Sequence, residues 1–268
     1  MILHKDADTF AELIAFAAEQ RGLPQVYIEK DYWITRALQA LSNSGHGVQA
    51  IFKGGTSLSK AHRLIDRFSE DIDLAIFNKD MGDARRKRQL KQVEQAAAHE
   101  LIVVKNDPRE SKGSYYRKTV YQYPRSIDSD TFGQASPELL IEVNAFTNPE
   151  PFERMTLQSA IAEELINNDR EELVKLFQLQ GFDIDVLSVR RTLTEKILGV
   201  IKDSYHENPV AKLSDRIRHL YDICMILKLR KKYHHHQDML PLKGDRTITF
   251  MLNGFWFSKT TSIDTPSG

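Results

Sequence analysis

Residues 52–77 read FKGGTSLSKAHRLIDRFSEDIDLAIF, and this stretch decides the fold. The apolar run at 48–52 predicts a short strand, and Gly54-Gly55 predicts a turn out of it. Residues 57–68 then predict a helix, because apolar side chains recur at helical spacing. Residues 71–77 predict a second strand, because Ile72, Leu74 and Ile76 alternate with other residues. The expected buried face of the helix is Leu58, Ala61, Leu64, Ile65 and Phe68.

The glycine turn predicts a phosphate site. Gly54 and Gly55 let a backbone approach a triphosphate closely, and a helix that begins there supplies free N–H groups. Thr56 and Ser57 add hydroxyl groups, of which that of Ser57 can donate to a phosphate oxygen. The G-x-x-x-x-G-K-[ST] spacing of a Walker motif is missing. Taken alone, Gly-Gly-Thr-Ser is also an ordinary turn and helix cap.

Three carboxylates predict a Mg²⁺ site. Asp71 and Asp73 lie two apart on the predicted strand, so both face one side of it. Two converging carboxylates repel each other unless a cation lies between them, and Mg²⁺ prefers such oxygen ligands. Glu142 is the lone acid in the apolar run 139–143 and is the candidate third ligand. Each pattern alone also fits a solvated strand face or an exposed edge.

Composition describes an ordinary globular chain. Of 268 residues, 37 are Lys or Arg and 37 are Asp or Glu, so net charge argues neither for nor against nucleic acid. The single cysteine, Cys224, excludes an intramolecular disulfide and fits a reducing cytoplasm; its apolar neighbours predict a core position. No apolar run approaches the roughly 18 residues of a membrane span. The N-terminus has acidic residues and no signal-peptide pattern.

The order of the predicted elements indicates an α+β fold. Helices are predicted at 8–21, 26–42 and within 83–104, and further strands at 101–104, 115–123 and 139–146. Helical patterns dominate from about 156 to 232, with a loop near 180–187 and a break at Pro209. We therefore predict a small mixed sheet with helices in residues 1–150 and a mostly helical domain in residues 151–268. Residues 237–268 carry no helical period, and their role stays open.

The stretch KGGTSLSKAHRLIDRFSEDIDLAI at 53–76 resembles the signature of the nucleotidyltransferase AbiEii toxin family, a branch of the polymerase-β-like nucleotidyltransferases. Residues 28–33 resemble the upstream helix of that family, and residues 140–144 resemble its third-carboxylate strand. Residues 193–198 and 218–223 resemble its later lysine and Arg-x-x-Tyr-Asp motifs. The resemblance covers about residues 10–230 and leaves the tail outside.

The resemblance implies a Mg²⁺-dependent transfer of NMP from an NTP to an acceptor hydroxyl, with a tRNA 3′ end as acceptor and a cognate antitoxin as partner. It makes Lys196 a triphosphate contact and Asp222 part of the active site, where Asp215 competes for that role. From spacing alone, Lys196 is a snorkelling surface lysine and Asp222 pairs with Arg218, its i−4 neighbour. A small-molecule or protein hydroxyl is an alternative acceptor, and a non-catalytic binding module is a third reading.

Basic and aromatic stretches are candidate RNA surfaces. They are Arg85–Arg88, Tyr115–Lys118 and Lys228–His236, although each stretch taken by itself is more often a solvated charged face. Three consecutive histidines, 234–236, cannot all face one metal from a regular helix, so we predict no zinc site there.

Overall fold

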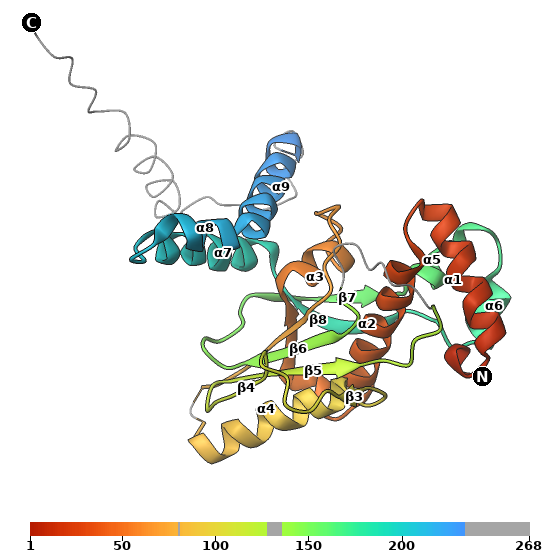
Figure 1. Cartoon of the computed structure of the whole chain (residues 1–268), viewed down its shortest axis with the longest axis horizontal. Coiled ribbons are helices and arrows are strands. Elements are labelled where there is room, and N and C mark those ends of the chain that lie inside the picture. Colours follow the sequence, from red (N-terminus) through yellow and green to blue (C-terminus); the bar gives the residue numbers. More distant parts are fainter. Residues whose placement is uncertain (80, 128–135, 234–268) are drawn as a thin grey trace, which may run out of the picture. The chain divides into compact units, whose positions relative to one another are not determined.

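A computed structural model describes residues 1–79, 81–127 and 136–233 (Figure 1). The first compact unit of the chain runs from Met1 to Ile226, and a second begins at Leu227. The predicted division near residue 150 falls inside the first unit, between two strands of one sheet.

One mixed sheet carries the fold, and its strand order is β3-β5-β6-β2-β1-β8-β7, with β4 paired to β5. β2 lies parallel to β6 and antiparallel to β1, and β1 lies parallel to β8. This mixed sheet with its helices confirms the predicted α+β class. The strands are β1 (Ala50–Lys53), β2 (Ile72–Ile76), β3 (Ile102–Val103), β4 (Ser111–Lys112), β5 (Tyr116–Gln122), β6 (Leu139–Asn144), β7 (Phe152–Leu157) and β8 (Phe182–Leu187).

The helices begin and end at residues with recognisable caps. The Asp6 side chain accepts from the Thr9 N–H at the start of α1, and Gly22 ends that helix at φ 60°. Pro209 is the first residue of α8, where its missing N–H costs no hydrogen bond. The helices are α1 (Ala7–Arg21), α2 (Gln25–Asn43), α3 (Gly54–Lys60), α4 (Asp83–Ala97), α5 (Ala160–Asn167), α6 (Glu171–Leu176), α7 (Val189–Ser204), α8 (Pro209–Asp215) and α9 (Ile217–Tyr233).

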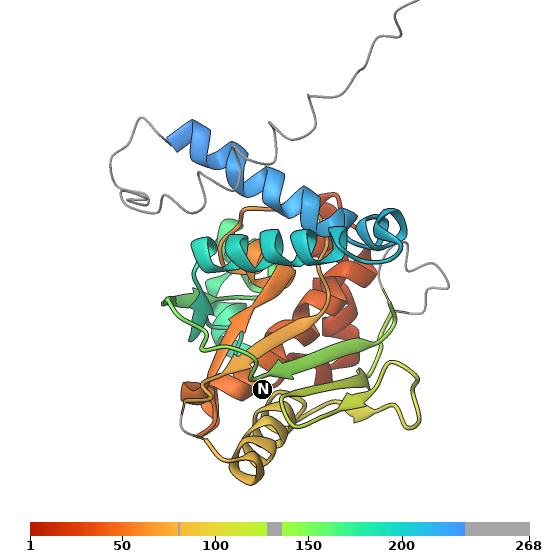
Figure 2. The ribbon, with the colours of Figure 1, turned by 90° about the vertical axis from the view of Figure 1, so that its left-hand side faces the viewer.

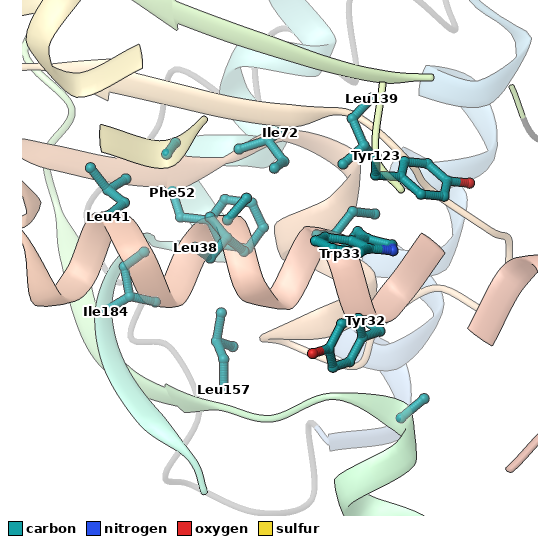
Figure 3. Packing of buried hydrophobic residues seen from close by; sticks show 14 of the residues in the cluster. Tyr32, Trp33, Leu38, Leu41, Phe52, Ile72, Tyr123, Leu139, Leu157 and Ile184 are labelled. Carbon is teal, nitrogen blue, oxygen red and sulfur yellow. The ribbon is translucent and has the colours of Figure 1, made fainter. Parts of the chain in front are cut away.

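The core lies between α2 and one face of the sheet (Figure 3). Trp33 and Leu38 of α2 are buried, as are Phe52 of β1 and Ile72 of β2. Because side chains alternate along a strand, Lys53 and Asp73, the neighbours of these strand residues, point to the opposite face. The sheet thus separates an apolar face from a face that carries the predicted carboxylates.

Two predicted elements differ from the structure. The helix predicted at 57–68 ends at Lys60, and Arg63 has φ 52°, a left-handed conformation that a helix cannot continue. The chain turns back there and brings Ser69 to Thr56, whose hydroxyl lies 3.0 Å from the Ser69 hydroxyl. The loop predicted near 180–187 is instead β8, whose central position beside β1 makes it part of the sheet.

Cys224 is exposed rather than a core residue. In α9 the inward-facing positions are Asp222 and Ile226, one helical turn apart. Cys224 lies two residues from each and therefore faces away from them.

Candidate active site

The register of the sheet aligns four charged residues in one row. Asp73 of β2 lies opposite Glu142 of β6 and opposite Lys53 of β1. Glu142 lies opposite Lys118 of β5. Residues directly opposite on paired strands project to the same face. The row Lys118, Glu142, Asp73, Lys53 therefore runs across the sheet, and Asp71 lies just before β2 on the same side.

Gly54 leaves the space that the Asp73 carboxylate occupies. A Cβ at position 54 would lie 1.9 Å from Asp73 Oδ2, far inside van der Waals contact. Gly54 also has φ 82°, which side chains rarely adopt. Gly55 is confined in a similar way, because its Cβ would lie 2.6 Å from Arg67 Nη2 and 2.7 Å from Ser69 Oγ. Gly54 thus leaves the room in which the Asp73 side chain lies, whereas the Arg67 atom beside Gly55 is the far end of a flexible side chain.

The surroundings of the two aspartates disfavour their negative charge. Burial and the charges of Glu142 and Asp71 raise the pKa of Asp73 to about 7. Burial and the charges of Glu70 and Glu142 likewise raise the pKa of Asp71. Within the described residues, neither carboxylate forms an ion pair or accepts a hydrogen bond. Both are therefore available to a cation.

Asp71 and Asp73 suit Mg²⁺, which keeps several water ligands, better than a metal ion whose ligands are all protein side chains. In the described part of the chain, no group of three or more His, Cys, Asp and Glu side chains is arranged to hold a metal ion. Glu142 is paired with Lys118, with 2.7 Å between Oε1 and Nζ. Mg²⁺ keeps several waters and is usually held by one or two carboxylates together with substrate phosphates. Asp71 and Asp73 supply the carboxylates for such a site, and Glu142 would have to release Lys118 to join them.

Thr56 and Ser57 use their hydroxyls within the protein. The Thr56 hydroxyl donates to the Asp71 carbonyl oxygen at 2.6 Å, and the Ser57 hydroxyl donates to the Gly54 carbonyl oxygen at 3.0 Å. Both side chains are buried. As they stand, these hydroxyls position the Gly54 turn and the backbone of Asp71. Ser57 would have to exchange its acceptor before it could donate to a phosphate.

Lys196 and Asp222 meet in a buried ion pair, with 2.8 Å between Nζ and Oδ2. Arg67 completes the group, because its Nε and Nη2 donate to the two Asp222 oxygens at 2.8 and 2.7 Å. Burial opposes ionisation of Asp222, but hydrogen bonds from Arg67 and Lys196 hold its pKa below the ordinary value. Asp222 thus pairs with Arg67 and Lys196 rather than with Arg218, the partner that helical spacing alone suggests. Asp215, the competing acid, closes the short helix α8.

Several residues of this region are not apparent from sequence reasoning. Arg67 lies inside the signature stretch, but nothing in its spacing relates it to Asp222, which is 155 positions away. Lys53 bonds Glu195 of α7 at 2.5 Å, and Arg191 of α7 bonds the Thr147 hydroxyl at 3.0 Å. These contacts hold α7, and with it Lys196, beside the end of the sheet where β1 leads into α3 (Figure 2).

His219 contributes an uncharged side chain near this cluster. Burial and the charge of Lys196 lower its pKa to about 4. Its Nδ1 has no hydrogen-bond partner in the described residues. The positive charge near Asp222 therefore comes from Lys196 and Arg67.

Three consecutive residues of α2, Glu29, Lys30 and Asp31, form hydrogen bonds and ion pairs with segments that are distant in sequence. Glu29 accepts from the Ser126 N–H at 2.5 Å. Lys30 is fully buried, pairs with Glu70, and donates to the Ser136 carbonyl oxygen at 2.6 Å. Asp31 accepts from Lys60 Nζ at 2.5 Å and from the Ala160 N–H at 2.7 Å. Lys30 thus fixes the residue that precedes Asp71 in the chain.

The predicted basic and aromatic surfaces are partly used inside the fold. Arg86 is buried and its guanidinium lies 3.5 Å from the centre of the Tyr115 ring. Arg117 pairs with Glu94 and Lys118 pairs with Glu142. The histidines at 234–236 lie outside the described residues. Among the described residues, no helix is both long and apolar enough to cross a membrane.

Comparisons of sequence and structure relate the chain to known proteins. No curated protein matches the chain. Among solved structures, MenT4, a nucleotidyltransferase toxin from Mycobacterium tuberculosis H37Rv, matches with a TM-score of 0.41 and 16% identity over 70% of this chain. The match covers 58% of MenT4 itself.

A family model described as nucleotidyl transferase AbiEii toxin, type IV toxin–antitoxin system, matches residues 36–260. The match begins later than the resemblance that we draw from the motifs. It also extends over residues 237–260, which that resemblance leaves outside. Because it covers most of the chain, this protein belongs to the AbiEii family of nucleotidyltransferase toxins.

Proposed function

We propose that this enzyme transfers a nucleoside monophosphate from an NTP to the 3′ hydroxyl of a tRNA, with Mg²⁺ bound by Asp71 and Asp73. One observation carries the proposal: the Gly54 turn holds the Asp73 carboxylate opposite Glu142, on the face of the sheet that bears Asp71. Among the described residues, Asp71 and Asp73 have no ion-pair partner, whereas Glu142 is paired with Lys118, so the two aspartates are suited to a cation.

The reaction exchanges one P–O bond for another and releases one proton. The acceptor hydroxyl loses its proton to water as its oxygen bonds to the α-phosphorus of the NTP, the bond from that phosphorus to the β-phosphate oxygen breaks, and pyrophosphate leaves. Bound Mg²⁺ supplies charge stabilisation to the reacting phosphate oxygens. Catalysis by the protein is positioning together with electrostatic stabilisation.

Residues beyond the carboxylates have separate roles. Lys196, oriented by Asp222, offsets charge on the leaving pyrophosphate, and Arg67 keeps Asp222 ionised. Gly54 and Gly55 form the turn beside the triphosphate, and Thr56 and Ser57 hold that turn in shape. Glu142 could serve as a third carboxylate at the metal site once it is released from Lys118.

The acceptor and the biological setting rest on family membership. Type IV toxin–antitoxin systems pair such an enzyme with a cognate antitoxin. A tRNA 3′ end is an acceptor whose modification would stop translation and so arrest growth. Such an activity belongs in the cytoplasm, where tRNA and NTPs are found.

The test is a transfer assay with purified protein, Mg²⁺, total tRNA and each α-labelled NTP in turn. The inactive variant is Asp71→Ala/Asp73→Ala. The chain offers a matched control, because Asp183-Ile184-Asp185 repeats the Asp-Ile-Asp sequence on β8. There, Asp183 accepts from the Thr156 hydroxyl and Asp185 pairs with Arg154. Asp183→Ala/Asp185→Ala should therefore keep the activity.

We expect label on tRNA with wild type and with the Asp183→Ala/Asp185→Ala control. We expect no label with Asp71→Ala/Asp73→Ala. Turnover of NTP without label on tRNA would move the acceptor to a small molecule or a protein hydroxyl. No turnover by folded protein, together with growth inhibition that survives Asp73→Ala, would replace the enzyme with a binding module.

A further inference from the structure

Aromatic side chains gather on the carboxylate face of the sheet. Tyr116 begins β5 and lies opposite Asn144 of β6, two residues beyond Glu142. Side chains two apart on a strand share a face, so Tyr116 projects to the same side as Glu142. Because Lys118 lies opposite Glu142, Tyr116 is the diagonal neighbour of Glu142 across the strand pair, within reach of an aromatic side chain. Tyr116 thus lies beside the candidate active site.

Phe146 extends this aromatic surface into solvent. Its ring is nearly parallel to that of Tyr116, with 17° between the planes and 5.9 Å between the centres. Phe146 is 63% exposed, which is unusual for a phenylalanine beside a site of buried charge. It follows Glu142 by four residues, or about 13 Å of extended chain. The contact between Arg191 and Thr147 fixes the next residue against α7.

We infer that Tyr116 and Phe146 form a stacking platform for a nucleobase. The inference rests on the proposed function, since a nucleotide whose phosphates lie at Asp71 and Asp73 would extend its base along this face. Tyr116 supports one side of Phe146, and the exposed ring of Phe146 is the surface for the base. Every base has a flat π face that can stack on such a ring. The base belongs either to the incoming NTP or to the terminal nucleotide of the acceptor RNA.

The variants separate stacking from simple apolar contact. Phe146→Ala removes the ring, Phe146→Leu keeps an apolar side chain without a flat face, and Phe146→Tyr keeps the flat face. The matched control is Tyr205→Ala, because Tyr205 is also an exposed aromatic residue, and it follows the last residue of α7 rather than lying on the sheet. Melting temperatures establish that each variant is folded, as expected for changes at exposed positions.

The first measurement is KM for the NTP and KM for tRNA, with kcat. Phe146→Ala and Phe146→Leu should each raise one KM by about 5- to 150-fold with little change in kcat. Phe146→Tyr and Tyr205→Ala should match wild type. A rise in the KM for NTP assigns the base to the nucleotide, and a rise in the KM for tRNA assigns it to the acceptor. Unchanged values for both substrates, or a wild-type Phe146→Leu enzyme, would overturn the platform.

A second measurement does not depend on turnover. Phe146→Trp places a fluorescent side chain on the platform, and ATP or a short RNA should quench it, whereas ribose triphosphate without a base should not. If wild type transfers no label, quenching still supports the platform while the proposed reaction fails. If wild type is active and neither probe quenches, the platform fails while the reaction stands.

Discussion

Gly54 is confined twice, once by its backbone and once by its neighbour. Its φ of 82° disfavours any side chain, and the Asp73 carboxylate fills the position of a Cβ. Gly22 shares the first constraint at φ 60° but has open space where its Cβ would lie. Comparing substitutions at Gly54 and Gly22 therefore distinguishes the effect of backbone strain from the effect of displacing the Asp73 carboxylate.

Gly54→Ala should reduce transfer activity by at least about 100-fold, because small displacements of catalytic groups have effects of that size. Gly22→Ala should cost only about 1 kcal/mol of folding free energy, from the left-handed backbone, and keep full activity. Steady-state kinetics and urea denaturation of both variants check this. An active Gly54→Ala enzyme would show that Asp73 need not lie where the glycine places it.

The raised pKa of Asp73 makes stability depend on pH. The pKa is about 7 in the folded protein and near 3.8 in the unfolded chain. Between these values the folded state binds a proton that the unfolded state has lost, so the free energy of unfolding falls as the pH rises. Without divalent ions, Asp73→Asn should melt about 3 °C above wild type at pH 8, and the difference should vanish towards pH 4. Melting curves that keep a constant separation across this range would contradict the assignment.

At the residue scale, sequence reasoning identifies side chains better than it identifies their partners. Asp71, Asp73, Glu142, Lys196 and Asp222 follow from motifs, and the structure joins the last two directly. Arg67 escapes notice because its contact with Asp222 depends on the chain reversal after Lys60, which no local pattern encodes. The repeated Asp-Ile-Asp on β8 shows the same limit, since only the register and Gly54 distinguish the two copies.

At the scale of the elements, α2 connects the core with several segments that are distant in sequence. Its apolar residues lie in the core, whereas Glu29, Lys30 and Asp31 bond segments that are distant in sequence. Burial lowers the pKa of Lys30 although Glu70 favours its charged form. The helix therefore connects the core to the residue before Asp71.

Lys30→Met should cost about 3 kcal/mol of folding free energy, because it leaves the Glu70 carboxylate without its cation in a largely buried place. Arg36→Met on the same helix removes the more exposed pair with Glu100 and should cost less than about 1 kcal/mol. Urea denaturation measures both. Equal losses would mean that the Lys30 pair contributes no more than a surface pair.

Most elements before residue 150 agree with their patterns, because they carry a clear helical or alternating period; α3, which ends at Lys60, is an exception. β8 also alternates, with Phe182, Ile184 and Val186 between two aspartates, but the surrounding helical patterns obscure it. Its place beside β1 depends on long-range pairing that a local period does not contain. The early end of α3 is likewise set by contacts of Thr56 with residues 69 and 71.

At the scale of the whole molecule, binding of Mg²⁺ should raise the free energy of unfolding. A ligand that binds only the folded state raises the free energy of unfolding, by about 1.4 kcal/mol at tenfold excess over Kd. Mg²⁺ should therefore raise the melting temperature of wild type by about 4 °C, and a chelator should reverse the change. Asp71→Ala/Asp73→Ala should lose this response, whereas Asp183→Ala/Asp185→Ala should keep it. A response that survives in the first variant would place the ion elsewhere.

The close approach of Gly54 to Asp73 also has a genetic consequence. Every missense change of a glycine codon introduces a Cβ, and at position 54 each one meets the Asp73 carboxylate. In a population that survives induced expression of the gene, inactivating substitutions should therefore accumulate at codon 54, whereas codon 22 should remain largely unaltered. Sequencing the survivors would map the active site without any purified protein.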